Sequence, residues 1–178
     1  MRTEIRIAGF GGQGVGLAGH ILGKALAIFT ENEAVMTQSY GPEARGGASS
    51  ADIVTSDIPI DYPFVQNPDI LITLSQEAYT KFRSTSKEGG KVLIDSGLVT
   101  PYQDDFTFNI PATALAEELG NRIVANMVML GFFTAVAGIV KREPIEKSIE
   151  TTVKARFIKL NLKAFDTGFV YAMDKVAG

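Results

Sequence analysis

The sequence predicts an α/β domain of three layers, with a Rossmann-like open sheet of mostly parallel or mixed strands and a helical C-terminal part. Three observations predict this class. Short apolar strands alternate with helical segments early in the chain, a glycine-rich loop joins the first strand to the first helix, and helices dominate the last third. The length of 178 residues fits a single domain over 1–178.

The first part of the chain alternates between strands and helices. The opening strand places Ile5 and Ile7 on either side of Arg6, and the helix after it repeats apolar residues at helical spacing. Ser75 is a candidate N-cap for the second helix, which follows a continuous apolar run typical of a buried strand. We expect strands at 4–8, 34–40, 51–55 and 69–74, and helices at 17–29 and 76–82.

The second part of the chain is mainly helical. We expect strands at 91–94 and 106–110, and helices at 112–119, 123–140, 144–153 (opened by Pro144) and 155–176. The helix at 123–140 is apolar except for Asn126 and Thr134, so it approaches the length of a membrane span. Because the chain has no other such segment, we expect this helix to lie in the core or in a subunit interface instead.

Composition excludes several classes of protein. The net charge is -3 and the isoelectric point is about 5.2, which argues against a nucleic-acid or anionic-membrane partner. The chain has no cysteine, so it holds no disulfide and no cysteine-ligated iron–sulfur cluster, and one histidine, His20, cannot form a multi-histidine zinc site. We therefore expect no metal site. The first ten residues lack the apolar core of a signal peptide, which predicts a cytoplasmic protein.

The stretch IAGFGGQGVG, residues 7–16, contains the spacing G-x-G-x-x-G at Gly9, Gly11 and Gly14. Glycines let the backbone approach a ligand closely, and the following helix presents free N–H groups, so the loop favours a phosphate or pyrophosphate. NAD, FAD and CoA all carry such a group. The second strand ends in TQSY without the acidic residue of a nicotinamide site, and no Walker lysine follows the loop. A tight turn without a ligand remains the alternative.

A second glycine-rich stretch, QSYGPEARGG at 38–47, follows the second strand. Loops at the carboxyl ends of parallel strands meet at one edge of a sheet, so we expect the two glycine loops to lie close together. Arg45 is a candidate for a bidentate contact to a phosphate or carboxylate. The alternatives are that Glu43 and Arg45 form a solvated pair, or that Glu43 contacts a partner subunit.

Four segments in this order, GFGGQGV, QSYGPEARGG, PDILITLSQEA and NMVMLGFF, resemble the gamma subunits of 2-oxoacid:ferredoxin oxidoreductases over about residues 5–175. The resemblance implies a complex that converts a 2-oxoacid and CoA into acyl-CoA and carbon dioxide and passes two electrons to ferredoxin. It also implies that thiamine diphosphate, magnesium and the iron–sulfur clusters lie on partner alpha and beta subunits, with a delta subunit as an open alternative. The second loop looks more like the 2-oxoglutarate type than the pyruvate type.

The resemblance also implies site residues for CoA binding and for assembly, and no catalytic residue on this chain. It places CoA near Gly9, Gly11, Gly12, Gln13, Gly14 and Val15, and assigns the subunit interface or the CoA channel to Ser39, Tyr40, Gly41, Glu43, Arg45, Gly46, Gly47 and Asn126. For Asn126, a buried amide with satisfied hydrogen bonds is the alternative. Two other functions stay open: an independent nicotinamide- or flavin-dependent oxidoreductase, and a purely structural assembly protein. An exposed apolar helix face would favour a homodimer of the isolated chain.

Overall fold

Six strands form one sheet in the computed structural model, which describes residues 1–40 and 47–176. The strands are β1 (Thr3–Gly9), β2 (Glu33–Ser39), β3 (Ser49–Ser56), β4 (Ile70–Thr73), β5 (Lys91–Asp95) and β6 (Phe108–Ile110). The α-helices are α1 (Val15–Phe29), α2 (Gln76–Phe82), α3 (Ala112–Glu118), α4 (Ala125–Ala137), α5 (Arg142–Thr152) and α6 (Ala155–Val176). Two short 3-10 helices are η1 (Arg83–Thr85) and η2 (Arg122–Val124).

The sheet has the strand order β2-β3-β1-β4-β5-β6. The pairs β1–β4, β4–β5 and β5–β6 are parallel, whereas β3 runs antiparallel to both β1 and β2. All strands except β3 therefore run in one direction, which confirms the predicted mixed, mostly parallel sheet. The position of β3 between β1 and β2 was not predicted, because alternation of apolar residues does not reveal strand direction.

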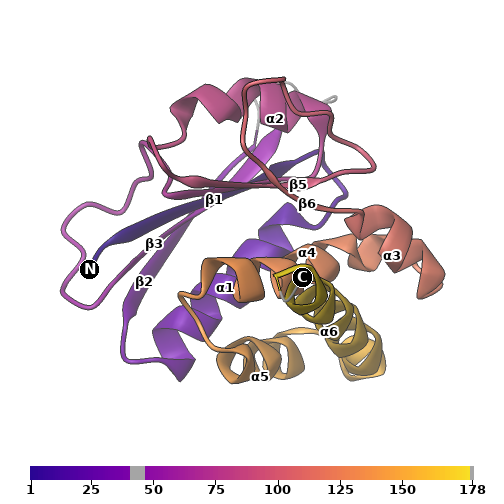
Figure 1. Cartoon of the computed structure of the whole chain (residues 1–178). Coiled ribbons are helices and arrows are strands. Elements are labelled where there is room, and N and C mark those ends of the chain that lie inside the picture. The colour runs from indigo at the N-terminus through magenta and orange to yellow at the C-terminus, as the bar shows by residue number, and fades with distance from the viewer. Residues whose placement is uncertain (41–46, 177–178) are drawn as a thin grey trace.

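Helices cover the two faces of the sheet unequally (Figure 1). α1, α4, α5 and α6 lie below the sheet in this view, and α2 lies above it. The alternation along β1 explains the division, because Ile5 and Ile7 join the large core on the α1 face while Ala8 packs with Ala78 of α2 on the other face. The expected α/β architecture is confirmed, with its upper layer formed by a short helix.

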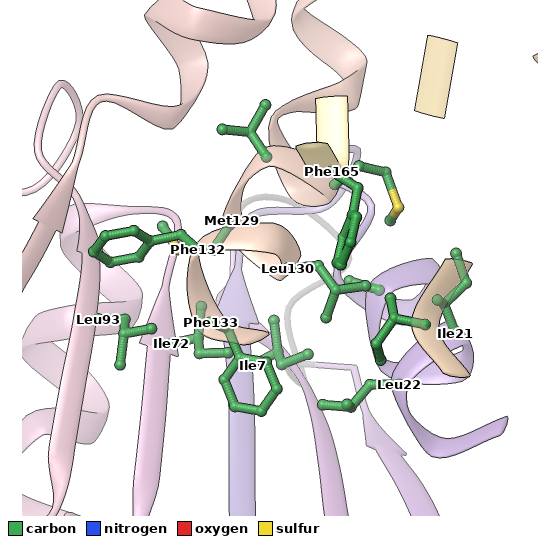
Figure 2. Close-up of a cluster of buried hydrophobic side chains, with 14 of the residues drawn as sticks. Ile7, Ile21, Leu22, Ile72, Leu93, Met129, Leu130, Phe132, Phe133 and Phe165 are labelled. Atoms are coloured by element: carbon green, nitrogen blue, oxygen red, sulfur yellow. The ribbon is translucent and has the colours of Figure 1, made fainter. Parts of the chain in front are cut away.

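The main core lies between the sheet and α4 (Figure 2). Ile7, Ile72 and Leu93 project from neighbouring strands toward Phe133 of α4, and Leu130 lies between the sheet and Phe165 of α6. The segment 126–134 of α4 is buried on all sides, which explains its apolar sequence. Within the described part of the chain, no helix is long and apolar enough to cross a membrane.

Two glycines let α4 and α6 cross at backbone contact. A Cβ atom added at Gly131 of α4 would lie 2.8 Å from the carbonyl carbon of Phe165, and closer still to its oxygen. A Cβ atom added at Gly168 of α6 would meet the carbonyl of Val128 in the same way, at 2.7 Å from its carbon. Each glycine is therefore required by the helix that crosses it.

The observed bounds differ from the predicted ones at most ends, by one to three residues. The segment expected as a helix at 123–140 is η2 followed by α4, which stops at Ala137 because Gly138 adopts a left-handed φ of 66° and ends the helix. α5 begins two residues before Pro144, which lies in the first turn. The strand expected at 106–110 begins at Phe108. α2 has the predicted bounds, and Ser75 Oγ accepts a hydrogen bond from the Ala78 amide at 3.2 Å, as an N-cap does.

Candidate functional site

The glycine loop lies where the chain connections diverge from the sheet. After β1 the chain enters α1 on one face, and after the adjacent strand β4 it enters α2 on the other face (Figure 1). In open α/β sheets, such a divergence at the carboxyl ends of two neighbouring strands opens a crevice where ligands bind. The loop 10–14 occupies this position.

Gln13 closes the bottom of the crevice. Its Oε1 accepts a hydrogen bond from the Phe10 amide at 2.7 Å, and its Nε2 donates to the Leu74 carbonyl at 2.7 Å, which joins the loops after β1 and β4. Gly9 leaves room for this side chain, since a Cβ there would lie 2.6 Å from Gln13 Oε1. The Gln13 side chain therefore shapes the loop. From the sequence, Gln13 was expected only as a residue near CoA.

The glycines of the loop serve different purposes. Gly14 is the N-cap of α1, with φ of 72°, and a Cβ there would overlap the side-chain amide of Asn126. Gly11 and Gly12 lie at the tip of the loop, where an added Cβ would have no atom within 4 Å. The φ of Gly12 is 90°, so its backbone conformation favours glycine, whereas Gly11 has no such requirement. Within the described chain, neither packing nor backbone geometry explains a glycine at position 11.

Asn126 at the start of α4 holds the loop from behind. It is 3% exposed, its Nδ2 donates to the Gly14 carbonyl at 3.1 Å, and its Oδ1 accepts from the Met127 amide at 2.9 Å. The side chain is thus a buried amide with satisfied hydrogen bonds that supports the loop. The 112 residues between Asn126 and Gly14 explain why sequence reasoning could not pair them.

The first turn of α1, directly after the loop, has backbone donors that no group of the helix satisfies. The first intrahelical bond runs from the Ala18 amide to the Gly14 carbonyl at 3.0 Å, which leaves the N–H groups of Val15, Gly16 and Leu17 without a partner inside the helix. The N-cap is a glycine, and the first turn holds no acidic residue. The positive end of the helix dipole is therefore open to an anion.

A hollow of about 140 Å³ lies in front of the loop. Its wall carries one cationic side chain, Arg122, which is exposed. It is lined by Gly12, Gln13, Leu74, Thr113, Arg122, Ile123 and Ala125. A larger hollow of about 390 Å³, called here the apolar groove, begins on the other side of Ile123. The apolar groove is lined by Leu17, Asn121, Ile123, Val124, Asn126, Val153, Lys154, Phe157, Leu160 and Asn161.

Thr113 is held at the wall of the hollow by Asp95. The carboxylate of Asp95 is fully buried at the end of β5 and accepts from the Thr113 amide at 2.9 Å, the Thr113 hydroxyl at 2.6 Å and the Gly97 amide at 3.1 Å. It replaces the missing N-cap of α3, whose cap position is Pro111. Sequence reasoning missed this pair, although an aspartate ending a buried strand was a visible signal.

The ends of the second glycine-rich stretch lie beside the first loop. Ser39 pairs with Ser50 at the sheet edge, Gly9 pairs with Ser49, and a Cβ at Gly16 would overlap the amide of Gln38. The predicted proximity of the two loops is therefore confirmed for the described ends, where Tyr40 is 77% exposed and Gly47 is half-buried. Gly41, Glu43, Arg45 and Gly46 lie outside the described residues.

The strongest electrostatic cluster lies away from the hollow. Arg83 binds Asp105 through two hydrogen bonds of 2.5 and 2.6 Å and lowers the pKa of that carboxyl. Burial and the hydrogen bond to Asp105 raise the pKa of the Tyr79 phenol. Arg83 also stacks over Tyr102 at 4.4 Å. This cluster fastens the loop before β6 to α2. Among the described residues, no group of histidine, cysteine, aspartate and glutamate side chains is arranged to hold a metal ion.

Comparison with known proteins gives the family. A model described as pyruvate ferredoxin/flavodoxin oxidoreductase matches residues 4–171. This chain belongs to that family. The 2-oxoglutarate synthase subunit KorC of Methanocaldococcus jannaschii is 51% identical to it over 98% of this chain and 96% of the relative.

Solved structures agree with the assignment. The gamma subunit of a keto/oxoacid ferredoxin oxidoreductase from Geobacter sulfurreducens is 42% identical, with a TM-score of 0.89 over 98% of each chain. The family member described here is accordingly a gamma-type subunit of a 2-oxoacid:ferredoxin oxidoreductase, as its motifs predicted. A 2-oxoglutarate:ferredoxin oxidoreductase from Magnetococcus marinus, described with 2-oxoglutarate, coenzyme A and succinyl-CoA bound, shares the fold at 23% identity. Its TM-score is 0.88, and the match spans 97% of this chain but 31% of that one.

Proposed function

We propose that this chain is the gamma subunit of a 2-oxoglutarate:ferredoxin oxidoreductase and that its glycine loop holds part of CoA. The complex would convert 2-oxoglutarate and CoA into succinyl-CoA and carbon dioxide, and two electrons would pass to ferredoxin. Partner alpha and beta subunits would supply thiamine diphosphate, magnesium and the iron–sulfur clusters, for which this chain has no cysteine ligand. The names of the 2-oxoglutarate synthase relatives, 41–51% identical to this chain, support this choice of 2-oxoacid.

The observation that carries the CoA proposal is the unobstructed tip of the loop. Gly11 has open space where a side chain would be and needs no special φ. A glycine with no role in the fold is explained when something outside the chain must approach its backbone. The open N-terminus of α1 lies next to it and favours a phosphate, and Arg122 on the wall adds a positive charge.

The size of the hollow limits which part of CoA it holds. Pockets that bind drug-sized ligands measure roughly 300–1,000 Å³, so a hollow of about 140 Å³ accommodates one phosphate-sized or thiol-sized portion. The rest of the molecule would extend along the apolar groove or against a partner subunit. The groove suits the aliphatic part of the pantetheine arm, because Leu17, Val153 and Leu160 line it.

The topology argues against a nicotinamide site. In dinucleotide-binding folds, an acidic residue at the end of the strand beside β1 binds the ribose. Here the neighbour of β1 on that side is the antiparallel strand β3, which presents Ser49 and Ser50 at this edge. The strand that follows α1, β2, is one position further out and ends in Gln38 and Ser39. Neither strand places a carboxylate where the ribose would lie.

The test compares two alanine substitutions in the complex purified without oxygen through a tag on this chain. Gly11→Ala fits the fold but fills the space at the loop tip, so we expect the KM for CoA to rise about tenfold, equivalent to about 1.4 kcal/mol. Gly23→Ala is the control. Gly23 lies inside α1, away from the hollow, and its Cβ would make an ordinary 3.6 Å contact with Met36 of β2. The KM for 2-oxoglutarate should not change in either variant.

Each outcome decides one part of the proposal. A normal KM for CoA in an intact Gly11→Ala complex would assign the loop to assembly alone. Loss of partner subunits from Gly11→Ala would assign the loop tip to the subunit interface. Activity of the unmodified complex with another 2-oxoacid but not with 2-oxoglutarate would overturn the substrate assignment and leave the CoA test intact.

A further inference from the structure

The edge strand β2 has an unpaired side that a second strand could extend. β2 lies at the end of the sheet, and among the described residues only β3 pairs with it. The other edge strand, β6, has three residues, whereas β2 has seven. Natural proteins protect long edges with proline, lysine or bulges. The sequence of β2, EAVMTQS, contains no proline and no basic residue, and its single charge is Glu33 at one end.

The pairing along the sheet shows which backbone groups of β2 face outward. The Ala8 carbonyl accepts a hydrogen bond from the Leu74 amide, just after β4. The backbone N–H and C=O groups of even-numbered β1 residues therefore point to β4, and those of odd-numbered residues point to β3. Odd-numbered residues of β1 lie opposite odd-numbered residues of β3. The backbone N–H and C=O groups of odd-numbered β3 residues therefore point to β1, and those of even-numbered residues point to β2. The partners of those even residues are Glu33, Val35, Thr37 and Ser39. The N–H and C=O groups of Ala34, Met36 and Gln38 therefore point away from the sheet.

We propose that two copies of this chain pair through β2, antiparallel about a two-fold axis at Met36, so that their sheets become continuous. In this register Met36 lies opposite the partner's Met36, and Ala34 lies opposite the partner's Gln38. Each of these residue pairs exchanges two backbone hydrogen bonds through the outward-facing groups. Val35 lies opposite the partner's Thr37, a pair of β-branched residues that suits a strand, and Glu33 lies opposite the partner's Ser39. The register places no like charges opposite each other.

The flank of α1 also suits a second copy. α1 packs against both β2 and β3, and strands are about 4.8 Å apart. An α1 axis centred between β2 and β3 would therefore lie about 10 Å from its symmetry mate, close to the packing distance of two helices. Gly16 and Gly23 contact the side chains of β2, and His20 and Ala27 follow them at a spacing of four residues and are exposed. Lys24 is directed to the other side, where it bonds to the Thr151 carbonyl of α5 at 3.1 Å.

The first test measures the mass of the full chain in solution by light scattering and sedimentation over a range of concentrations. Gln38→Pro removes an outward N–H while leaving the β2–β3 ladder intact, and Gln38→Ala keeps that N–H. Ala27→Arg adds like charges across the axis at an exposed position. Ile28→Arg makes the same change at the next position, which is 65% exposed and lies one turn after Lys24, whose side chain reaches α5. We expect a dimer for the unmodified chain, Gln38→Ala and Ile28→Arg, and a monomer for Gln38→Pro and Ala27→Arg.

The second test uses backbone hydrogen exchange and cross-linking. The amides of Ala34 and Met36 should exchange slowly in the dimer and at least tenfold faster in both monomeric variants, while those of Val35 and Thr37 stay protected in all. The Gln38 amide should behave like those of Ala34 and Met36 in the unmodified chain and in Ala27→Arg. The chain has no cysteine, so Val35→Cys combined with Thr37→Cys should link two copies of this chain within the complex under mild oxidation. A chain that is monomeric at all concentrations, or a dimer that survives both blocking variants, would overturn the proposal. Protection of these amides only when other subunits are present would overturn it too. None of these readouts depends on CoA.

Discussion

Gly131→Ala tests the backbone contact between α4 and α6. The added Cβ would lie 2.8 Å from the Phe165 carbonyl carbon and 2.9 Å from the Phe169 amide nitrogen, whereas carbon atoms pack at about 3.5–4.0 Å. Both obstructing groups are backbone, so the two helices must separate along their contact. Overpacking of this kind costs about 1–3 kcal/mol and sometimes more.

The net magnitude follows from two opposing effects. Alanine favours a helix over glycine by about 1 kcal/mol, so a clash at the upper end of its range leaves a net loss of about 2 kcal/mol. For a chain of this length, each kcal/mol shifts the melting temperature by about 2–4 °C. We therefore expect Gly131→Ala to melt about 4–8 °C below the unmodified chain.

Gly23→Ala in the middle of α1 is the matched control. Its Cβ would contact Met36 at 3.6 Å, so the helix preference acts without a clash. We expect a rise of about 0.5–1 kcal/mol in the free energy of unfolding, measured with the same thermal and urea unfolding assays. If Gly131→Ala melts at or above the unmodified chain, as Gly23→Ala should, the inferred backbone contact is wrong.

Three further changes test other parts of the structure. Asn126→Ala should lower the free energy of unfolding by about 1–3 kcal/mol in urea unfolding, because it removes two buried hydrogen bonds, to the Gly14 carbonyl and from the Met127 amide, and an unchanged midpoint would contradict the support of the loop by α4. Asp105→Asn should destabilise the chain at pH 7 but less so near pH 3. Because the pKa of Asp105 is lowered in the folded chain, its ionised carboxyl stabilises the fold at pH values above the unfolded pKa. This contribution is lost as the pH falls through the folded pKa. Equal melting-point losses at the two pH values would refute that contribution. Tyr79→Phe should remove the phenol that ionises at the highest pH in an ultraviolet titration, since burial and Asp105 raise its pKa; an unaltered titration curve would contradict this assignment.

Local features of the fold were accessible from the sequence. α2 was predicted with its bounds because Ser75 signals the N-cap and the residues after it carry the apolar spacing of a helix. The loop 10–14 was recognised because its glycines lie between a strand and a helix, as the motif requires. These features depend on residues a few positions apart, which a single sequence displays.

Long-range features were not accessible. The antiparallel direction of β3 depends on which neighbours it pairs with, and its own alternation is the same in either direction. The contacts from Gln13 to Leu74 and from Asp95 to Thr113 join residues 61 and 18 positions apart. The glycines of the loop looked equivalent in the sequence, yet only Gly11 and Gly12 face open space while Gly9 and Gly14 make room for side chains.

The contact between Asn126 and Gly14 has a consequence for how the protein is synthesised. The loop 10–14 leaves the ribosome before β3 and β4, the two strands that pair with β1. Its support on α4 is made 112 residues later, and α4 is held in turn by Gly168 near the end of α6. A nascent chain therefore carries an unsupported loop until α4 and α6 have been synthesised. The loop thus takes its final form only after α4 and α6 have folded onto the sheet.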